Sequence, residues 1–200
     1  MKKRLVLKKL ISTTTTLLIL ASGTAQALVS MIPQAPAINA KGYVLMDYNS
    51  GEIIASNNPD LELAPASLTK MMTAYIIGQE INNGRLSFDD KVTVSENAWS
   101  RKSPDSSKMF IEPGDQISVA NLSRGIMIQS GNDASVAMAE HIAGSESAFV
   151  EMMNSWARQL GLSNSYFVNA HGLDGEGIAT SPWDMAILTQ RLIRDTPDVY

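Results

Sequence analysis

A serine and a lysine stand three residues apart at the start of a predicted helix, in the stretch Pro65-Ala66-Ser67-Leu68-Thr69-Lys70. On a helix, residues at this spacing lie on one face, with about 5–6 Å between their Cβ atoms. The spacing suits a hydroxyl nucleophile and an amine that accepts its proton. We therefore predict that Ser67 is a nucleophile and that Lys70 is its general base.

The sequence around Lys70 favours this chemistry. Pro65 lies near the first helical position, where its missing N–H costs nothing. Residues 71–77 are apolar on nearly every side of the helix, which is typical of a buried helix. Burial and the positive end of the helix dipole both disfavour the ammonium form, so the pKa of Lys70 is expected to fall toward neutrality. A serine and lysine at this spacing also occur by chance, so the motif needs support from the rest of the chain.

A second group of polar residues, Ser130-Gly131-Asn132, lies between two predicted helices, 60 residues beyond Lys70. In a cleft, the Ser130 hydroxyl could relay a proton between a lysine and a leaving amine, and the Asn132 carboxamide could orient a substrate amide. The alternative interpretation is that Asn132 only caps the helix that follows it.

The elements that must position these residues follow from periodicity and capping signals. Residues 42–47 and 52–56 predict two strands joined by a turn at 48–51, a β-hairpin. A stretch from 85 to 117 looks irregular, with one short strand at 91–94 and an exposed loop at 101–108.

Four further helices complete the expected architecture. After the helix at 65–82, helices are predicted at 119–129, from Asn132 or Asp133 to His141, at 145–160 and at 181–194. Ser118, Ser145 and Ser181 are the expected caps of three of them. A glycine-rich loop at 171–177 precedes the last helix. Strands followed by helices indicate an α+β fold, but too few strands are present for a compact sheet, so the sequence is expected to stop before its domain does.

The N-terminus has the layout of a secretory signal peptide. A basic leader, Met1 to Lys9, precedes a short apolar stretch and the small-x-small cleavage site Ala25-Gln26-Ala27. The apolar stretch is interrupted by residues 12–16 and is too short to span a bilayer comfortably. We predict cleavage after Ala27, so that residues 28–200 form the exported chain.

Charge and composition exclude several classes of protein. The leader carries five lysines and arginines and no acidic residue, so its removal takes the net charge from −4 to −9. An acidic domain without a basic stripe is a poor binder of nucleic acid. The absence of cysteine excludes disulfides, cysteine nucleophiles and thiolate metal sites. With only two histidines, 30 residues apart, a metal site is not expected either, and no cofactor is implied.

Taken together, the motifs resemble those of the serine-type D-alanyl-D-alanine carboxypeptidases, the low-molecular-mass penicillin-binding proteins. The similarity covers roughly residues 41–198, in matching order and spacing. It is carried by Val44-Leu45-Met46-Asp47-Tyr48, Pro65 to Lys70, Met109-Phe110 through Pro113-Gly114-Asp115, Gln129 to Ala134, His171-Gly172-Leu173-Asp174 and Asp184-Met185-Ala186.

The resemblance implies a penicillin-binding, β-lactamase-like transpeptidase fold: a sheet with flanking helices and a helical subdomain. It implies that Ser67 attacks the penultimate D-alanine carbonyl of a peptidoglycan stem peptide and forms an acyl-enzyme, with Lys70 as base. Ser130 would pass a proton to the leaving D-alanine, and Asn132 would hold the substrate amide. The Ser67 N–H would supply half of an oxyanion hole. His171 is expected to order its loop and, where it lines the cleft, to bind substrate.

The chain departs from the family pattern at several points. No Lys-Thr-Gly motif occurs in residues 1–200, although in the family this motif lies on a later strand that binds the substrate carboxylate and supplies the second oxyanion donor. The family's second β-rich domain and C-terminal amphipathic membrane helix are also absent. We therefore hypothesise that the chain is a truncated N-terminal part of the catalytic domain. Asp105 stands where the family often has glycine.

The resemblance also implies the partners: a stem peptide ending in D-alanyl-D-alanine, and β-lactams as covalent inhibitors. The expected location is the periplasm or the outer face of the cytoplasmic membrane, with any membrane attachment supplied by a C-terminal segment outside this sequence. Three alternatives remain. They are a class A β-lactamase that uses Glu176 for deacylation, a Ser-His-Asp hydrolase that uses His141 or His171, and an inactive wall-binding module.

Overall fold

The computed structural model describes residues 36–99 and 106–200. The predicted signal peptide and Asp105 lie outside the described residues, and so does most of the loop predicted at 101–108. Residues 38–200 form one compact unit. Among the described helices, none has both the length and the apolar character needed to cross a bilayer.

The predicted N-terminal hairpin is confirmed. Strands β1 (Tyr43–Met46) and β2 (Ile53–Asn57) pair antiparallel, with Tyr43 opposite Asn57. The turn between them is fixed by the Asp47 carboxylate, whose Oδ1 accepts hydrogen bonds from the backbone N–H and the hydroxyl of Ser50, both at 2.7 Å. These bonds lower the pKa of Asp47, because they favour its charged form.

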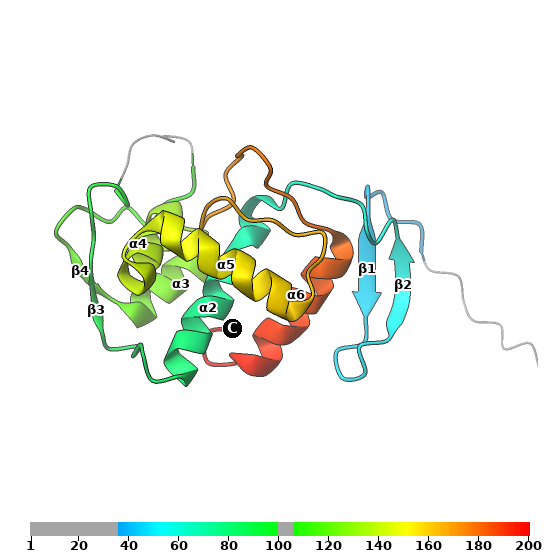
Figure 1. Cartoon of the computed structure of the whole chain (residues 1–200), viewed down its shortest axis with the longest axis horizontal. Helices are drawn as coiled ribbons and strands as arrows, with labels where there is room; N and C mark the ends of the chain where they lie inside the picture. Colours follow the sequence, from blue (N-terminus) through cyan, green and yellow to red (C-terminus); the bar gives the residue numbers. More distant parts are fainter. Residues whose placement is uncertain (1–35, 100–105) are drawn as a thin grey trace, which may run out of the picture. The chain divides into compact units, whose positions relative to one another are not determined.

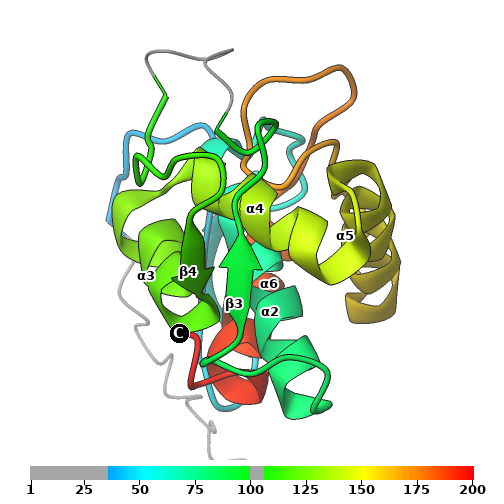
Figure 2. The ribbon, with the colours of Figure 1, turned by 90° about the vertical axis from the view of Figure 1, so that its left-hand side faces the viewer.

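The helix that carries the first motif begins as a 3₁₀ turn. This turn, η1 (Ala66–Thr69), holds Ser67 and leads directly into α2 (Lys70–Asn82). The prediction that this helix is buried is confirmed: Met72, Ile76 and Ile77 are fully buried. Because α2 contacts α3, α4, α5 and α6, it forms the centre of the helical core (Figures 1 and 2).

The short strand predicted at 91–94 is confirmed as β3 (Lys91–Thr93). It pairs antiparallel with β4 (Gln116–Ser118), a strand that the sequence analysis did not predict, with Val92 opposite Ile117. Each strand has only three residues, too few for an alternating pattern, and the two are joined by more than 20 residues. The pairing is therefore decided by tertiary contacts of β3 with α4 and of β4 with α3 (Figure 2).

The remaining helices are α3 (Val119–Gln129), α4 (Asn132–Ala143), α5 (Glu146–Leu160) and α6 (Pro182–Asp195). The predicted serine caps of α3, α5 and α6 are confirmed, since each hydroxyl accepts a hydrogen bond from the backbone N–H three residues later. The predicted cap of α4 is wrong: Gly131 occupies the N-cap position, without a side-chain cap.

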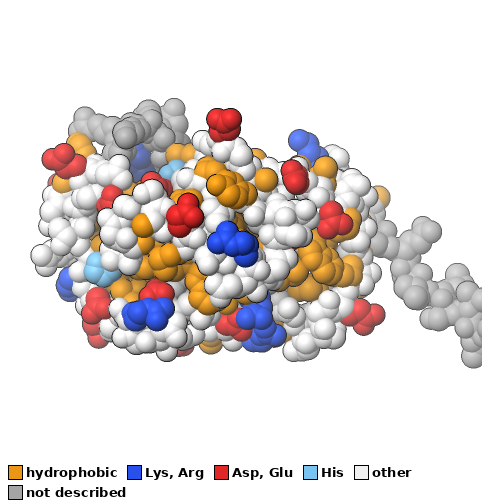
Figure 3. All heavy atoms as spheres, in the orientation of Figure 1, with side chains coloured by type: hydrophobic (Ala, Val, Ile, Leu, Met, Phe, Trp, Pro, Cys, Tyr) orange, Lys and Arg blue, Asp and Glu red, His pale blue; other side chains and the backbone are white. Residues whose placement is uncertain are grey.

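The hairpin packs beside α6, and α5 lies across α4 and α2 (Figure 1). Strands and helices are thus combined in an α+β arrangement, as expected. On the face shown in Figure 3, lysine and arginine side chains lie singly among acidic and apolar ones rather than in a basic stripe.

Candidate active site

Ser67 and Lys70 are brought together by the first turns of the buried helix. In its ammonium form, Lys70 Nζ donates a hydrogen bond to Ser67 Oγ at 3.4 Å. Ser67 is exposed, whereas Lys70 is 4% exposed. Ser67 thus faces solvent, and the amine beside it lies in the protein interior.

Burial lowers the pKa of Lys70 to about 8, so a substantial fraction of the side chain is a neutral amine at mildly alkaline pH. The predicted fall of this pKa is confirmed, with desolvation as its cause. A neutral amine can accept the proton of a serine hydroxyl, whereas an ammonium ion cannot.

The backbone just before Ser67 adopts a strained conformation. Ala66 has a φ of +48°, a region that residues with a Cβ rarely occupy. Gly172, from the distant loop, packs directly against this residue: a Cβ on Gly172 would lie 1.8 Å from the Ala66 carbonyl oxygen. The backbone N–H of Ser67 lies in the first helical turn, where N–H groups have no intrahelical acceptor. It can therefore donate a hydrogen bond to a substrate oxygen.

The second motif forms one wall of the cleft. Ser130 is the C-cap of α3 in the left-handed conformation, with φ +55°. Its Oγ donates a hydrogen bond to Ser67 Oγ at 3.0 Å. The structure thus joins Lys70, Ser67 and Ser130 in a chain of hydroxyl and amine groups, although Ser130 lies 63 residues from Ser67 along the sequence.

This turn is held by the residue that follows it, Asp133. Its buried carboxylate accepts backbone hydrogen bonds from Met109 and Phe110 at 2.8 Å, which ties the segment before α3 to the start of α4. Asn132 has its backbone N–H bonded to the Ser107 carbonyl at 2.9 Å, and its side chain lines a pocket. The interpretation that Asn132 caps α4 is therefore wrong, because its side chain makes no cap hydrogen bond.

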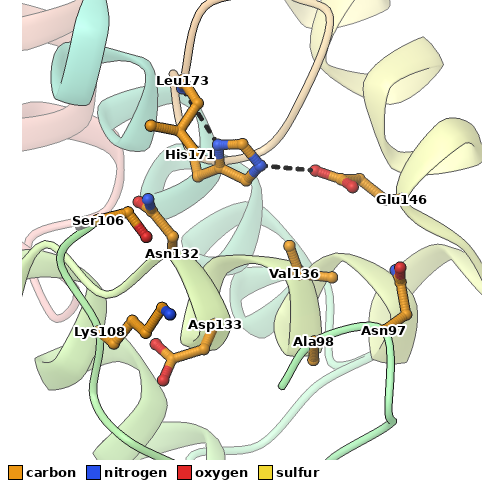
Figure 4. Close-up of a pocket in the computed structure, with 10 residues that line it drawn as sticks. All are labelled: Asn97, Ala98, Ser106, Lys108, Asn132, Asp133, Val136, Glu146, His171 and Leu173. Atoms are coloured by element: carbon orange, nitrogen blue, oxygen red, sulfur yellow. Dashed lines mark hydrogen bonds and ion pairs between the residues drawn. The ribbon is translucent and has the colours of Figure 1, made fainter. Parts of the chain in front are cut away.

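His171 lies on the opposite wall, in the glycine-rich loop. Its backbone carbonyl accepts a hydrogen bond from Lys70 Nζ at 2.7 Å. Burial, together with the nearby charge of Lys70, lowers the pKa of the His171 ring to about 4, so the ring is neutral at physiological pH. The expectation that His171 orders its loop and lines the cleft agrees with its position beside Asn132 and Leu173 (Figure 4).

The contact of His171 with Lys70 was not predicted from the sequence. It is made by a backbone carbonyl, which every residue possesses, and it joins positions 101 residues apart. A motif search finds side-chain types at fixed spacing, so no sequence signal could have identified it.

Two adjoining pockets lie along the cleft beside Asn132 and His171. One, of about 300 Å³, is lined by Ser67, Asn132 and His171. The second, of about 150 Å³, shares Asn132 and His171 and extends between Lys108 and Glu146 (Figure 4). An extended ligand that reaches Ser67 could therefore continue past Asn132.

The residues of the alternative hydrolytic mechanisms are elsewhere. Glu176 is exposed in its loop, and His141 is exposed on α4. The His171 ring faces Glu146, on α5, with Nε2 3.6 Å from Oε1. Ser67 is not hydrogen-bonded to this ring but to Lys70 and Ser130. The geometry thus favours the lysine over a histidine as the base.

Known proteins match both the sequence and the fold. The family profile of D-alanyl-D-alanine carboxypeptidases, Peptidase S11, matches residues 29–200. D-alanyl-D-alanine carboxypeptidase DacA of Escherichia coli K12 is 51% identical over 174 residues, which cover 86% of this chain and 43% of that protein. The DacA protein of Haemophilus influenzae is 52% identical over 165 residues, covering 82% of this chain and 42% of that protein.

Solved structures of penicillin-binding proteins resemble the fold of this chain. Penicillin binding protein 5 from Haemophilus influenzae superposes with a TM-score of 0.82 at 50% identity, over 84% of this chain and 49% of that chain. Penicillin binding protein 6B from Escherichia coli gives a TM-score of 0.82 at 44% identity, over 86% of this chain and 55% of that chain.

These likenesses show the penicillin-binding, transpeptidase-type fold that the motifs implied. The chain spans less than half the length of the two curated relatives described above. A profile match over most of the chain and about 50% identity to these relatives lead to one conclusion. The chain belongs to the D-alanyl-D-alanine carboxypeptidase family, Peptidase S11.

Proposed function

We propose that the chain is the N-terminal and helical part of the catalytic domain of a serine DD-carboxypeptidase. Its substrate is a peptidoglycan stem peptide ending in D-alanyl-D-alanine, and β-lactams acylate the same serine. The observation that carries this proposal is the hydrogen-bonded chain Lys70–Ser67–Ser130, at 3.4 and 3.0 Å, in which burial lowers the pKa of the lysine to about 8.

In the proposed acylation, Ser67 Oγ attacks the carbonyl carbon of the penultimate D-alanine while Lys70, as the free amine, accepts the hydroxyl proton. The Ser67 backbone N–H stabilises the developing oxyanion. Ser130 relays the proton to the nitrogen of the terminal D-alanine as the C–N bond breaks. Free D-alanine leaves, and an ester on Ser67 remains.

Water then hydrolyses the ester, which releases the shortened peptide and regenerates Ser67. Asn132 holds the substrate amide; this role is supported by its position in the pocket of about 300 Å³ that Ser67 also lines. The same acylation by a β-lactam opens the lactam ring and leaves an ester on Ser67.

We further propose that residues 1–27 are a signal peptide and that the exported chain acts outside the cytoplasmic membrane. The basic leader and the Ala25-Gln26-Ala27 site support this. Mass spectrometry of the exported protein should give an N-terminus at Leu28. An N-terminus at Met1 on the secreted protein would contradict it.

Intact-mass measurement after exposure to a labelled penicillin tests the catalytic proposal, with the complete product of the gene and with residues 28–200. We expect a single adduct on the wild-type protein and none on Ser67→Ala. We also expect release of D-alanine from an acyl-D-alanyl-D-alanine peptide by the complete product. An adduct on Ser67→Ala, or no adduct on the complete folded product, would overturn the proposal.

A further inference from the structure

Ala170, which leads directly into the glycine-rich loop at 171–177, is held from both sides by side chains of two helices. Its backbone N–H donates to Glu146 Oε1, on α5, at 3.0 Å. Its carbonyl accepts a hydrogen bond from Thr73 Oγ1, on α2, at 2.7 Å. Ala170 and Thr73 are fully buried, so this peptide has little freedom to move.

The carbonyl of the next residue, His171, is the one that accepts the hydrogen bond from Lys70 Nζ. Lys70 and Thr73 are three residues apart and lie on one face of α2, so they bind two successive carbonyls of the loop. The contact of Nζ with this carbonyl, at 2.7 Å, is shorter than its contact with Ser67 Oγ, at 3.4 Å. The position of the loop therefore determines where the amine lies.

This contact matters for proton transfer. A neutral lysine amine has two hydrogens and one lone pair. When one hydrogen is donated to the His171 carbonyl, rotation about the Cε–Nζ bond is restricted, and the lone pair can be directed toward the Ser67 hydroxyl. A lysine on a flexible four-carbon stem needs such an anchor to hold one orientation.

We propose that Glu146 is a positioning residue for the general base. Its carboxylate holds the Ala170 N–H, and so holds the His171 carbonyl against Lys70 Nζ in the orientation that accepts the Ser67 proton. This inference rests on the proposed function, because it assumes that Lys70 is the base.

The surroundings of Glu146 support this role. It is the first residue of α5, but the cap of that helix is already supplied by Ser145, so its carboxylate is available to the loop. His171 Nδ1 accepts a hydrogen bond from the Leu173 N–H at 3.1 Å, so the hydrogen of the neutral ring is on Nε2. That nitrogen faces the same Glu146 oxygen at 3.6 Å (Figure 4). One carboxylate oxygen therefore faces two N–H donors of the loop.

The test uses the complete gene product and a fluorescent penicillin in stopped-flow experiments. These separate the acylation rate constant of Ser67 from the dissociation constant of the preceding complex. In Glu146→Ala we expect the acylation rate constant to fall about tenfold, with the dissociation constant changed less than about twofold, because orientation of the base is lost while the cleft remains.

Glu146→Gln is the conservative variant, since its amide oxygen can still accept the Ala170 hydrogen bond. We expect it to recover most of the wild-type acylation rate constant. Glu151→Ala removes an exposed carboxylate from the same helix and is the matched control. It should leave both constants unchanged.

Thr73 provides an independent pair of variants. Thr73→Val keeps the side-chain shape and removes the hydroxyl that holds the Ala170 carbonyl, whereas Thr73→Ser keeps the hydroxyl. We expect Thr73→Val to lower the acylation rate constant and Thr73→Ser to leave it unchanged. All variants are compared below their melting temperatures, established by circular dichroism.

Two results would overturn the inference while the proposed function stands, provided that the wild-type protein is acylated. The first is an acylation rate constant in Glu146→Ala equal to that of the wild type. The second is an acylation rate constant in Glu146→Gln that falls as far as in Glu146→Ala. If wild-type Ser67 is not acylated, the proposed function fails and this inference fails with it.

Discussion

The two walls of the cleft beside Ser67 are built by different means. The turn at 130–133 places the Ser130 hydroxyl 3.0 Å from Ser67, and the loop at 167–173 places the His171 carbonyl 2.7 Å from Lys70. The turn connects two adjacent helices and is fixed by its left-handed backbone and by hydrogen bonds to the segment at 107–110. The loop has no regular structure and is fixed by side chains of α2 and α5.

In the turn, the left-handed Ser130 ends α3, and the Gly131 N–H bonds to the Gly125 carbonyl at 2.9 Å. Asp133 then anchors the segment at 109–110. Apart from the contact of Ser130 with Ser67, this wall is thus held by α3 and by one neighbouring segment, residues 107–110.

In the loop, the Asn154 side chain binds both the N–H and the carbonyl of Phe167, at 2.9 and 2.8 Å. Asn169 Oδ1 accepts hydrogen bonds from the His171 and Gly172 N–H groups, at 3.2 and 2.6 Å. This wall depends on partners scattered over the chain. The comparison indicates that the loop wall should be more easily displaced by a single substitution than the turn wall.

The largest effect is expected from Gly172→Ala. The new Cβ would overlap the Ala66 carbonyl and would lie 2.8 Å from Thr69 Oγ1. We expect the unfolding free energy to fall by about 3 kcal/mol or more, because both backbone strain and overpacking contribute. Acylation of Ser67 should fall with it. Urea unfolding and penicillin acylation measure the two effects.

Gly177→Ala is the matched control for this substitution. Its φ is also positive, at +86°, but the nearest atom to the new Cβ is 3.9 Å away. It should reduce the unfolding free energy by only about 1 kcal/mol, the strain of a left-handed residue. Equal losses in the two variants would show that the contact of Gly172 with Ala66 is unimportant.

The pH dependence of acylation examines both walls together, because Lys70 contacts the His171 carbonyl directly and is linked to Ser130 through Ser67. The acylation rate should rise with a midpoint near pH 8 as Lys70 loses its proton. At pH 6 the rate should be about 100-fold below its alkaline plateau, since two units below the pKa about 1% of the amine is neutral. The pKa of His171, at about 4, lies below this range, so its ring should not contribute.

The same profile can distinguish the walls. A displaced loop would admit water to Lys70 and raise the midpoint toward the ordinary lysine pKa, whereas Ser130→Ala should change the midpoint little. Stopped-flow acylation between pH 6 and pH 10 provides the measurement. A wild-type midpoint near pH 10 would contradict the assignment of a buried lysine as base.

The smallest effect concerns the turn. Ser130→Gly and Ser130→Ala both remove the proposed proton relay, so both should slow acylation. Only glycine relieves the positive φ, so Ser130→Gly should be about 1 kcal/mol more stable than Ser130→Ala. Calorimetric melting temperatures test this difference, and identical temperatures would show that the left-handed residue is unstrained.

Much of the fold could be predicted from the sequence because its signals are local. The β1–β2 hairpin, the buried character of α2 and the serine caps of α3, α5 and α6 all depend on neighbouring residues. The β3–β4 pair was missed in part, because β4 is short and its partner is distant. The 3₁₀ form of the first turn, which holds Ser67, was also not predicted.

The candidate site shows the same division. The sequence by itself was enough to propose Ser67, Lys70 and Ser130 from residue type, spacing and family resemblance, and the structure brings these three side chains together. It also predicted the direction of the Lys70 pKa shift, because an apolar helix implies burial.

Only the tertiary structure decided how these groups meet. It placed Ser130 against Ser67 across 63 residues and the His171 carbonyl against Lys70 across 101 residues. The physical reason is that a backbone carbonyl or a strained turn carries no residue-specific signal. Its role arises only when helices α2 and α5 and the glycine-rich loop pack together and leave one polar group within reach of another.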